Sequence, residues 1–395
     1  MTRRTIRLGL LAVGFVAVLA ELVSALAIRH VGRLDEPIRR TRSIYAEQTA
    51  RIRVILDSAP TAAMMIDSVS GWSPRPGHRR IGHAINSRGL RGRREYDSAA
   101  AGTLRVAAFG DSFVYGNEVH HPNEWAAVIE SAYPGVDMLN YGVSGYGTDQ
   151  ALLRFRRSGM ALQPELVLMG FTTDDLGRAV NVYRRFRHVN EYPLFKPRFL
   201  LGEDGSLTLQ PTPVTGLDGY QPLLRDPRAV RDFAKNDWWY QPWIYENPLY
   251  DWSATVRLAS TVFVRARRRL VPGYRLFADG EFDTTSTAFR LQVRLFDEFA
   301  RSVREAGSAP VALFLPDRTS VELARAGKPV LYARLRDAVR RLDIPVVDAA
   351  DAFVGKTDPV PDWFAPGGHY SVAGNRIVAM WLGPQLPGLA RPAAP

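Results

Sequence analysis

The chain contains no cysteine among its 395 residues. That absence excludes disulfide bonds, cysteine-ligated metal sites and thiol catalysis, and it suits an oxidising compartment without proving one. Internal repeats and low-complexity tracts are missing too, which argues against a solenoid or a largely disordered chain. Hydrophobic residues make up 46% and charged residues 23%, as in an ordinary folded domain. Any catalysis must use oxygen or nitrogen groups, and we expect no cofactor and no metal.

Lysine is scarce, since it supplies only four of the 51 basic residues and arginine supplies the others. The net charge of +11 would suit an acidic partner such as lipid headgroups, an anionic polysaccharide or nucleic acid. The arginines are scattered along the chain, however, and neither a helix-turn-helix nor a zinc-finger pattern occurs. We therefore expect no nucleic-acid partner.

One long apolar run is present, near the N-terminus. It covers 21 residues from Leu8 to Ile28, is interrupted only by Glu21 and Ser24, and follows three arginines. A helix needs about 20 apolar residues to cross a bilayer, so residues 1–29 are predicted to be a signal anchor or a signal peptide. The Ala-Leu-Ala sequence at 25–27 fits a cleavage site, and both interpretations stay open. Either one places the remaining chain beyond the inner membrane, on the periplasmic side.

The remaining chain divides into four segments by composition. Residues 30–100 combine a polar stalk helix at about 30–57 with a lead-in rich in Gly, Pro and Arg. Residues 101–180 alternate short apolar runs with helix-length stretches, and residues 286–390 resume that rhythm. Between them, residues 181–285 gain proline and aromatic residues and are predicted to be an inserted cap.

The two regular segments predict a parallel sheet. Strands that alternate with helices imply a doubly wound α/β/α sandwich. The candidate strands are the apolar runs at 104–109, 136–140, 166–171, 310–316 and 344–348, and the candidate helices lie near 123–132, 148–160, 288–306 and 319–342. We therefore predict five parallel strands in one sheet.

Gly110, Asp111 and Ser112 stand where the first of these strands ends. In such a sheet, ligands bind beyond the carboxyl ends of the strands. Glycine permits a tight turn there, and the N-terminus of the following helix offers N–H groups to a developing negative charge. Ser112 is therefore placed like a nucleophile. The Gly-x-Ser-x-Gly elbow of α/β-hydrolases is absent, because Val114 occupies the position of its second glycine.

A serine nucleophile needs a base and donors for the oxyanion. Of the seven histidines, only His369 lies beyond the last strand, in a Gly-rich loop that can face Ser112 across the crevice. His120 and His121 are adjacent and are interpreted as surface residues. The glycine-rich loop 142–147 lets a backbone N–H approach the reacting centre, and no phosphate-binding lysine follows it.

These blocks resemble the bacterial SGNH/GDSL hydrolase family, over roughly residues 70–385. "GDSF" is similar to the first block of that family, "NYGVSG" to the second and "GGHYSVAGN" to the last. The resemblance implies a flavodoxin-like SGNH hydrolase fold, with Ser112 as nucleophile and His369 as catalytic histidine. It also implies that the N–H groups of Ser112 and Gly145 form the oxyanion hole. "INSRGLRG" and "KPRFLL" resemble membrane-anchored members whose substrates are mostly unassigned.

The third block departs from the family's pattern. Where the family has Gly-x-Asn-Asp, the chain reads "GFTTDD", so Asp174 occupies the oxyanion asparagine position if Asp175 matches the aspartate. An ionised carboxylate would repel an oxyanion. Asp174 must therefore be protonated, turned away or replaced by another donor, for which the candidates are Asn181, Thr172 and Thr173.

The last block departs as well, because Pro366 replaces the aspartate of the family's Asp-x-x-His. The nearest upstream acid is Asp362, which a loop could bring to the ring of His369 as the third catalytic residue. The alternative is a Ser-His dyad in which a backbone carbonyl orients the ring.

The implied chemistry is acyl transfer from an ester to Ser112. Three functions remain open: a serine esterase acting on O-acetyl groups of a cell-envelope glycan, an O-acyltransferase on the same scaffold, and a catalytically degenerate glycan-binding or assembly protein. The aromatic segment 236–252 bears on the substrate, because exposed rings suit sugars or acyl chains. The alternative is that these rings form the cap's own small core. The sequence does not determine the oligomeric state.

Overall fold

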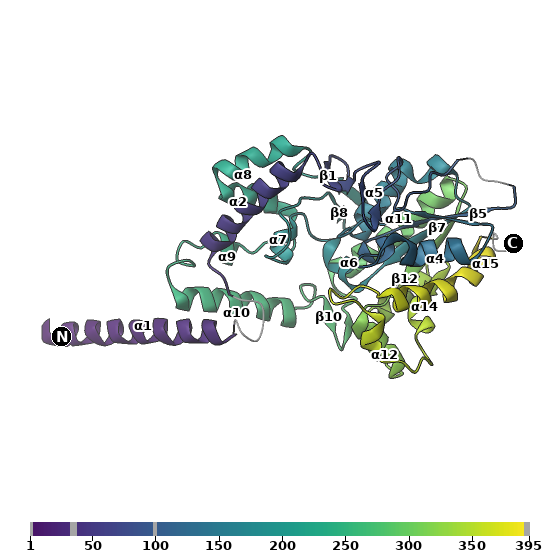
Figure 1. Ribbon diagram of the computed structural model, residues 1–395. Coiled ribbons are helices and arrows are strands. Elements are labelled where there is room, and N and C mark those ends of the chain that lie inside the picture. The colour runs from purple at the N-terminus through teal and green to yellow at the C-terminus, as the bar shows by residue number, and fades with distance from the viewer. Residues whose placement is uncertain (1–2, 32–37, 98–100, 391–395) are drawn as a thin grey trace.

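The computed structural model describes residues 3–31, 38–97 and 101–390. Its central sheet has five parallel strands in the order β13-β12-β7-β5-β6. Figure 1 labels three of them, β12, β7 and β5. These strands are β5 (Leu104–Phe109), β6 (Val136–Asn140), β7 (Leu166–Phe171), β12 (Ala309–Phe314) and β13 (Val346–Asp348). The predicted α/β/α fold with a five-stranded parallel sheet is confirmed.

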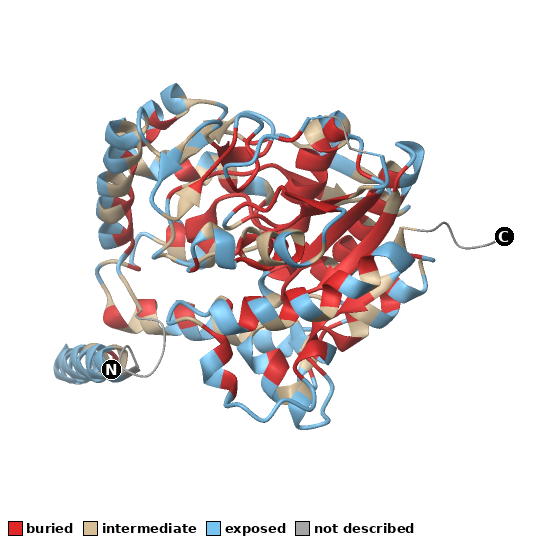
Figure 2. Cartoon of the chain, turned by 45° about the vertical axis from the view of Figure 1, so that its right-hand side comes forward, coloured by how far each residue is buried: buried red, intermediate tan, exposed pale blue. Residues whose placement is uncertain are grey.

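Helices cover both faces of this sheet, which explains why its strands are almost continuously apolar. In β5, every residue after Leu104 is buried. Figure 2 shows the buried strands between partly exposed helices. One face carries α4 (Trp125–Ala132) and α14 (Val372–Leu382), and the other carries α5 (Thr148–Ser158), α11 (Thr287–Glu305) and α13 (Ala333–Arg340).

The single helix predicted at 319–342 is two helices, α12 (Arg318–Arg325) and α13. Gly327 between them has a φ of +66°, which ends the first helix. Pro329 follows and lacks the N–H that a continuous helix would require. The apolar periodicity of residues 319–342 continues across this break, so it predicts one helix where the structure has two.

Two hairpins and a docked helix precede the sheet. The hairpins pair β1 (Met64–Asp67) with β2 (Gly71–Pro74) and β3 (Arg79–Arg80) with β4 (His83–Ala84). The predicted stalk is instead α2 (Thr41–Ser58), whose Tyr45 and Ile52 are buried against the cap. Residues 32–37 of the predicted stalk lie outside the described residues.

The segment predicted as a cap leaves the sheet after β7 and returns before α11. Its helices and strands are α7 (Arg184–Arg187), β8 (Arg198–Leu201), β9 (Leu207–Gln210), α8 (Gln221–Arg225), α9 (Pro242–Tyr245), α10 (Ala254–Leu270), β10 (Phe277–Ala278) and β11 (Glu281–Phe282). The aromatic segment divides between the two interpretations given above. Trp238 and Trp239 pack against buried clusters, whereas Trp243 and Trp252 are exposed.

The N-terminal apolar run forms α1 (Arg3–Val31), which projects from the rest of the chain and packs beside α10 (Figure 1). Within Arg3–His30, an 18-residue window has a mean hydropathy of 2.4 and is almost entirely exposed. By length and composition this helix can cross a membrane. A signal sequence has the same length and composition.

Candidate active site

Ser112 opens the short helix α3 (Ser112–Tyr115), directly beyond the carboxyl end of β5. A Cβ on Gly110 would lie 2.5 Å from Val114 Cγ2, so the turn between strand and helix requires glycine. The carboxylate of Asp111 accepts a hydrogen bond from the N–H of Phe113 (2.8 Å) and caps the helix. The local sequence therefore fixes Ser112 at the sheet edge.

His369 lies in the loop before α14, with its Nε2 atom 2.8 Å from Ser112 Oγ. The side chain of Ser371 accepts from the N–H of Gly374 and caps α14, so the helix begins just after the histidine. The side chain of Asn375 accepts from the N–H of Trp125 (3.0 Å) and fastens this region to α4. The structure thus brings together the two residues predicted as nucleophile and base.

The carboxylate beside His369 is that of Glu118. Its Oε2 atom lies 2.7 Å from His369 Nδ1 and accepts from the backbone N–H of His369 (3.0 Å). Its Oε1 atom accepts from the backbone N–H of Gly367 (2.6 Å). Partial burial raises the pKa of Glu118, but these hydrogen bonds outweigh burial and hold the pKa below its ordinary value. Glu118 is therefore an ionised acceptor that fixes the ring of His369.

The backbone of Glu118 has a φ of +66°, a conformation that residues other than glycine adopt rarely. Sequence reasoning missed this residue because it took the acid nearest upstream of His369, which is Asp362. The available signal was position: Glu118 follows the nucleophile by six residues, in the loop that leaves the same sheet edge.

Asp362, the predicted third catalytic residue, does not reach His369. A short 3-10 turn, Val360–Trp363, holds its backbone, and the carbonyl of Asp362 accepts from Ser371 Oγ (2.7 Å). The residue is exposed, and the Nδ1 side of His369 is occupied by Glu118. The prediction of Asp362 as the third catalytic residue is therefore wrong, and Glu118 stands in its place. The contact between Glu118 and Nδ1 also excludes a Ser-His dyad whose ring is oriented by a backbone carbonyl.

Gly145 lies in the loop after β6, which packs against the nucleophile turn. The N–H of Val143 donates to the carbonyl of Gly110 (3.0 Å), and the side chain of Asn117 donates to Ser144 Oγ (3.0 Å). Within the described part of the chain, the N–H groups of Ser112 and Gly145 have no acceptor. Both remain available to a ligand.

Asp174, at the predicted oxyanion position, instead pairs with two arginines. Its oxygens lie 3.0 Å from Arg178 and 2.6 Å from Arg187. Burial works in the opposite direction, yet the two guanidinium groups hold the pKa of Asp174 below its ordinary range. Asp174 is thus ionised and turned toward arginines, so it cannot donate to an oxyanion.

Two of the three replacement donors are also committed elsewhere. The side chain of Asn181 donates to the carbonyl of Tyr183 and to Asp237. The hydroxyl of Thr172 donates to Asp111 (3.0 Å). The hydroxyl of Thr173, which opens α6 (Thr173–Arg178), is buried without a partner among the described residues. Thr173 alone of these candidates keeps a free donor.

A cavity of about 590 Å³ adjoins the Gly145 loop. Its wall is mostly apolar and comes from α2, the β1 hairpin and the start of the cap. Its lining includes Ile55, Met64, Trp72, Gly145, Arg184 and Leu194. Among the described residues no group of three or more His, Asp or Glu side chains could hold a metal ion. The cavity can therefore receive a partly apolar ligand next to the Gly145 loop.

The model of the GDSL-like Lipase/Acylhydrolase family matches residues 108–377, more than half of the chain. Solved structures are similar at low identity. A putative lipolytic protein of the G-D-S-L family from Desulfitobacterium hafniense shares 12% identity over 71% of this chain and 99% of that chain, with a TM-score of 0.33. A catalytic mutant of an acetylxylan esterase from Geobacillus stearothermophilus shares 12% identity over 73% of this chain and 96% of that chain, with a TM-score of 0.36. No curated protein matches the sequence.

Proposed function

Since the chain belongs to the GDSL-like lipase/acylhydrolase family and is an ester hydrolase, we propose that Ser112, His369 and Glu118 are its catalytic triad. The observation that carries this proposal is the continuous line of hydrogen bonds from the Glu118 carboxylate through the imidazole to Ser112 Oγ. A nucleophile, a base and a group that orients the base are the three parts that serine acyl transfer requires.

In this mechanism, His369 Nδ1–H donates to Glu118, which leaves Nε2 free to accept the proton of Ser112. Ser112 Oγ attacks the ester carbonyl, and the tetrahedral intermediate collapses as Nε2 returns the proton to the departing alcohol. Water then gives a proton to Nε2 and attacks the acyl-enzyme, which releases the acid and restores Ser112. Glu118 stabilises the imidazolium that forms in both steps.

The N–H groups of Ser112 and Gly145 supply the oxyanion hole, because both lie at the sheet edge and lack acceptors among the described residues. We assign the third donor to Thr173, whose buried hydroxyl has no partner in the described chain. Thr173 follows β7, the strand that pairs with β5. Its hydroxyl would take the role that the family gives to an asparagine.

Thr173→Val is expected to lower kcat for a small ester by about 100-fold, as the loss of one oxyanion donor does. Thr173→Ser retains the hydroxyl and should keep most of the activity. Asp174→Asn is the matched control, since Asp174 pairs with arginines, and it should change kcat only slightly. Steady-state kinetics on the three variants would refute the assignment if Thr173→Val were as active as the parent.

The proposed substrate is an acyl ester on a cell-envelope glycan, with acetate as the acyl group. Two features support it: α1 is suited to anchor the chain in the inner membrane with the catalytic domain on the periplasmic side, and the cavity beside Gly145 can hold the group next to the ester. Arg75, Arg184 and Glu191 give this cavity polar partners for hydroxyl groups.

A serine-directed fluorophosphonate probe tests the proposed function. Labelling of the full chain in detergent, followed by peptide mapping, should place the adduct on Ser112. Incubation with an O-acetylated polysaccharide should then release acetate, and adding a glycan acceptor separates hydrolysis from transfer. No adduct at Ser112 together with no acetate release would favour the glycan-binding alternative.

A further inference from the structure

In the described part of the chain, burial of α1 begins near Glu21, in the last third of the helix. Toward its N-terminus the helix is bare, with Leu11 71% and Phe15 70% exposed. Further along, Ser24 is buried, and the helix packs against α10. The bare part and the docked part therefore meet near Glu21.

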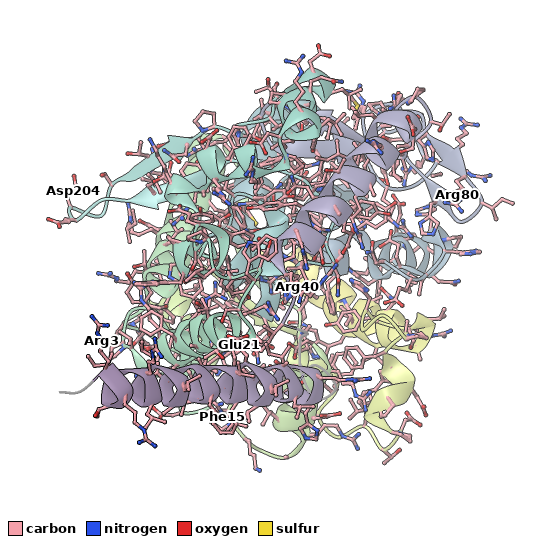
Figure 3. All side chains as sticks on the ribbon, turned by 90° about the vertical axis from the view of Figure 1, so that its left-hand side faces the viewer. Arg3, Phe15, Glu21, Arg40, Arg80 and Asp204 are labelled. Atoms are coloured by element: carbon pink, nitrogen blue, oxygen red, sulfur yellow. The ribbon has the colours of Figure 1, made fainter. Side chains whose placement is uncertain are left out.

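The carboxylate of Glu21 joins α1 to the N-terminus of α10. It accepts hydrogen bonds from the N–H of Ala254 (2.7 Å), the N–H of Thr255 (3.3 Å) and the hydroxyl of Ser253. These are free donors at the start of a helix, where a negative charge is favourable. Figure 3 shows Glu21 directed toward the domain and Phe15 directed away from it. The contact fastens α1 to the domain, and cleavage after Ala27 would remove it.

The length of α1 sets where a membrane must lie. The apolar run from Leu8 to Ile28 is about 31 Å long at 1.5 Å per residue, which matches a hydrocarbon thickness of about 30 Å. Only about 20 Å of it precedes Glu21. A bilayer crossed by α1 must therefore extend about 10 Å past the level of Glu21, where α10 begins.

Exposed apolar side chains gather on the segment before α10 and on that helix up to Phe263, beginning at this level. They are Trp243, Leu249, Trp252, Val262 and Phe263, between 49% and 78% exposed, and we call them the aromatic foot. Trp252 directly precedes the Ser253 that contacts Glu21, and the rings of Trp243 and Phe263 are 5.4 Å apart. A helix face toward water would be polar, whereas tryptophan is enriched at the membrane interface.

We propose that the aromatic foot is immersed in the outer interfacial region of the bilayer that α1 crosses. The domain is then seated on the membrane and does not hang from a flexible tether. The proposal rests on the membrane-spanning role given to α1 under the proposed function, and it explains why the carboxylate of Glu21 carries three donors at that depth.

The absence of cysteine allows the proposal to be tested in the full chain, because each introduced cysteine is unique. A nitroxide label would be attached to Leu11→Cys, Trp252→Cys, Phe263→Cys and Ile81→Cys in separate variants. Ile81 is 86% exposed, and Figure 3 shows its neighbour Arg80 on the opposite side of the domain from α1. Each variant would be reconstituted into phosphatidylethanolamine and phosphatidylglycerol vesicles, and its collisions with oxygen and a water-soluble nickel chelate compared.

We expect labels at 252 and 263 to collide with the nickel chelate several-fold less than the label at 81. The label at 11 should be the most protected of the four. Labels at 252 and 263 that are as accessible as the label at 81, with 11 still protected, would overturn the aromatic foot alone. An accessible label at 11 would instead overturn the membrane span itself, and the foot with it.

Discussion

Ser112→Ala is expected to lower kcat of ester hydrolysis by a factor of about 10,000 to 1,000,000, because no other hydroxyl can form the acyl-enzyme. His369→Ala should cost about as much, and the double variant should be barely worse than either single one, since the two residues act as a unit. Steady-state kinetics on a chromogenic acetate ester would measure all three variants.

Folding should not change in Ser112→Ala. In the described chain, Ser112 Oγ contacts only the imidazole of His369, so its removal leaves no buried group newly unpaired. Thermal unfolding of this variant checks the expectation. Ser144→Ala is the matched control, because Ser144 lies in the adjoining loop and has no proposed part in catalysis. Full activity in Ser112→Ala would refute the esterase mechanism and favour the binding-protein alternative.

Glu118→Gln should lower kcat by about 100-fold to 10,000-fold, because the neutral amide no longer selects the Nδ1–H tautomer or stabilises the imidazolium. The matched control is Asp362→Asn, which should leave kcat close to that of the parent, since Asp362 does not contact His369. The reverse result, a severe loss in Asp362→Asn and full activity in Glu118→Gln, would restore the acid indicated by sequence alone.

The ionised carboxylate of Glu118 should also affect the stability of the folded protein at low pH. The pKa of Glu118 is lower in the folded protein than in the unfolded chain, so its stabilising contribution is present above the unfolded pKa. That contribution is lost as pH falls through the lowered folded value. The stability difference between the parent and Glu118→Gln should therefore shrink as pH falls below about 4.

The sheet was predictable because each of its strands is buried on both faces. β5 and β7 begin and end where the apolar runs do, at Leu104–Phe109 and Leu166–Phe171. The surface against which a helix packs was harder to predict. The residues of α2 predict a polar, partly amphipathic helix, but burial of Tyr45 and Ile52 depends on a cap far along the chain. Local periodicity reveals that a face is apolar without revealing what covers it.

The nucleophile and the base could be predicted because each lies in a motif whose position in the fold is set by a neighbouring element. Glu118 was harder to predict, because no motif links it to His369 and its position six residues after the nucleophile is the one signal in the sequence. Its carboxylate meets the ring across 251 residues of chain, from a backbone conformation that composition does not indicate. Asp174 misled because a motif assigns only a position in the chain, whereas two arginines determine the ionisation and direction of its carboxylate.

The pairing of β7 with β12 has a consequence for how such an enzyme can diversify. The whole cap is inserted between these two strands, which are hydrogen-bonded neighbours in register from Leu166 to Phe171. The chain therefore leaves the sheet at the carboxyl end of β7 and returns, through α11, to the amino end of the neighbouring β12. Nucleophile, acid and base all come from segments outside this excursion. The cap can be lengthened, shortened or exchanged during evolution without moving the reacting groups, so new acceptors can be acquired while the chemistry is inherited intact.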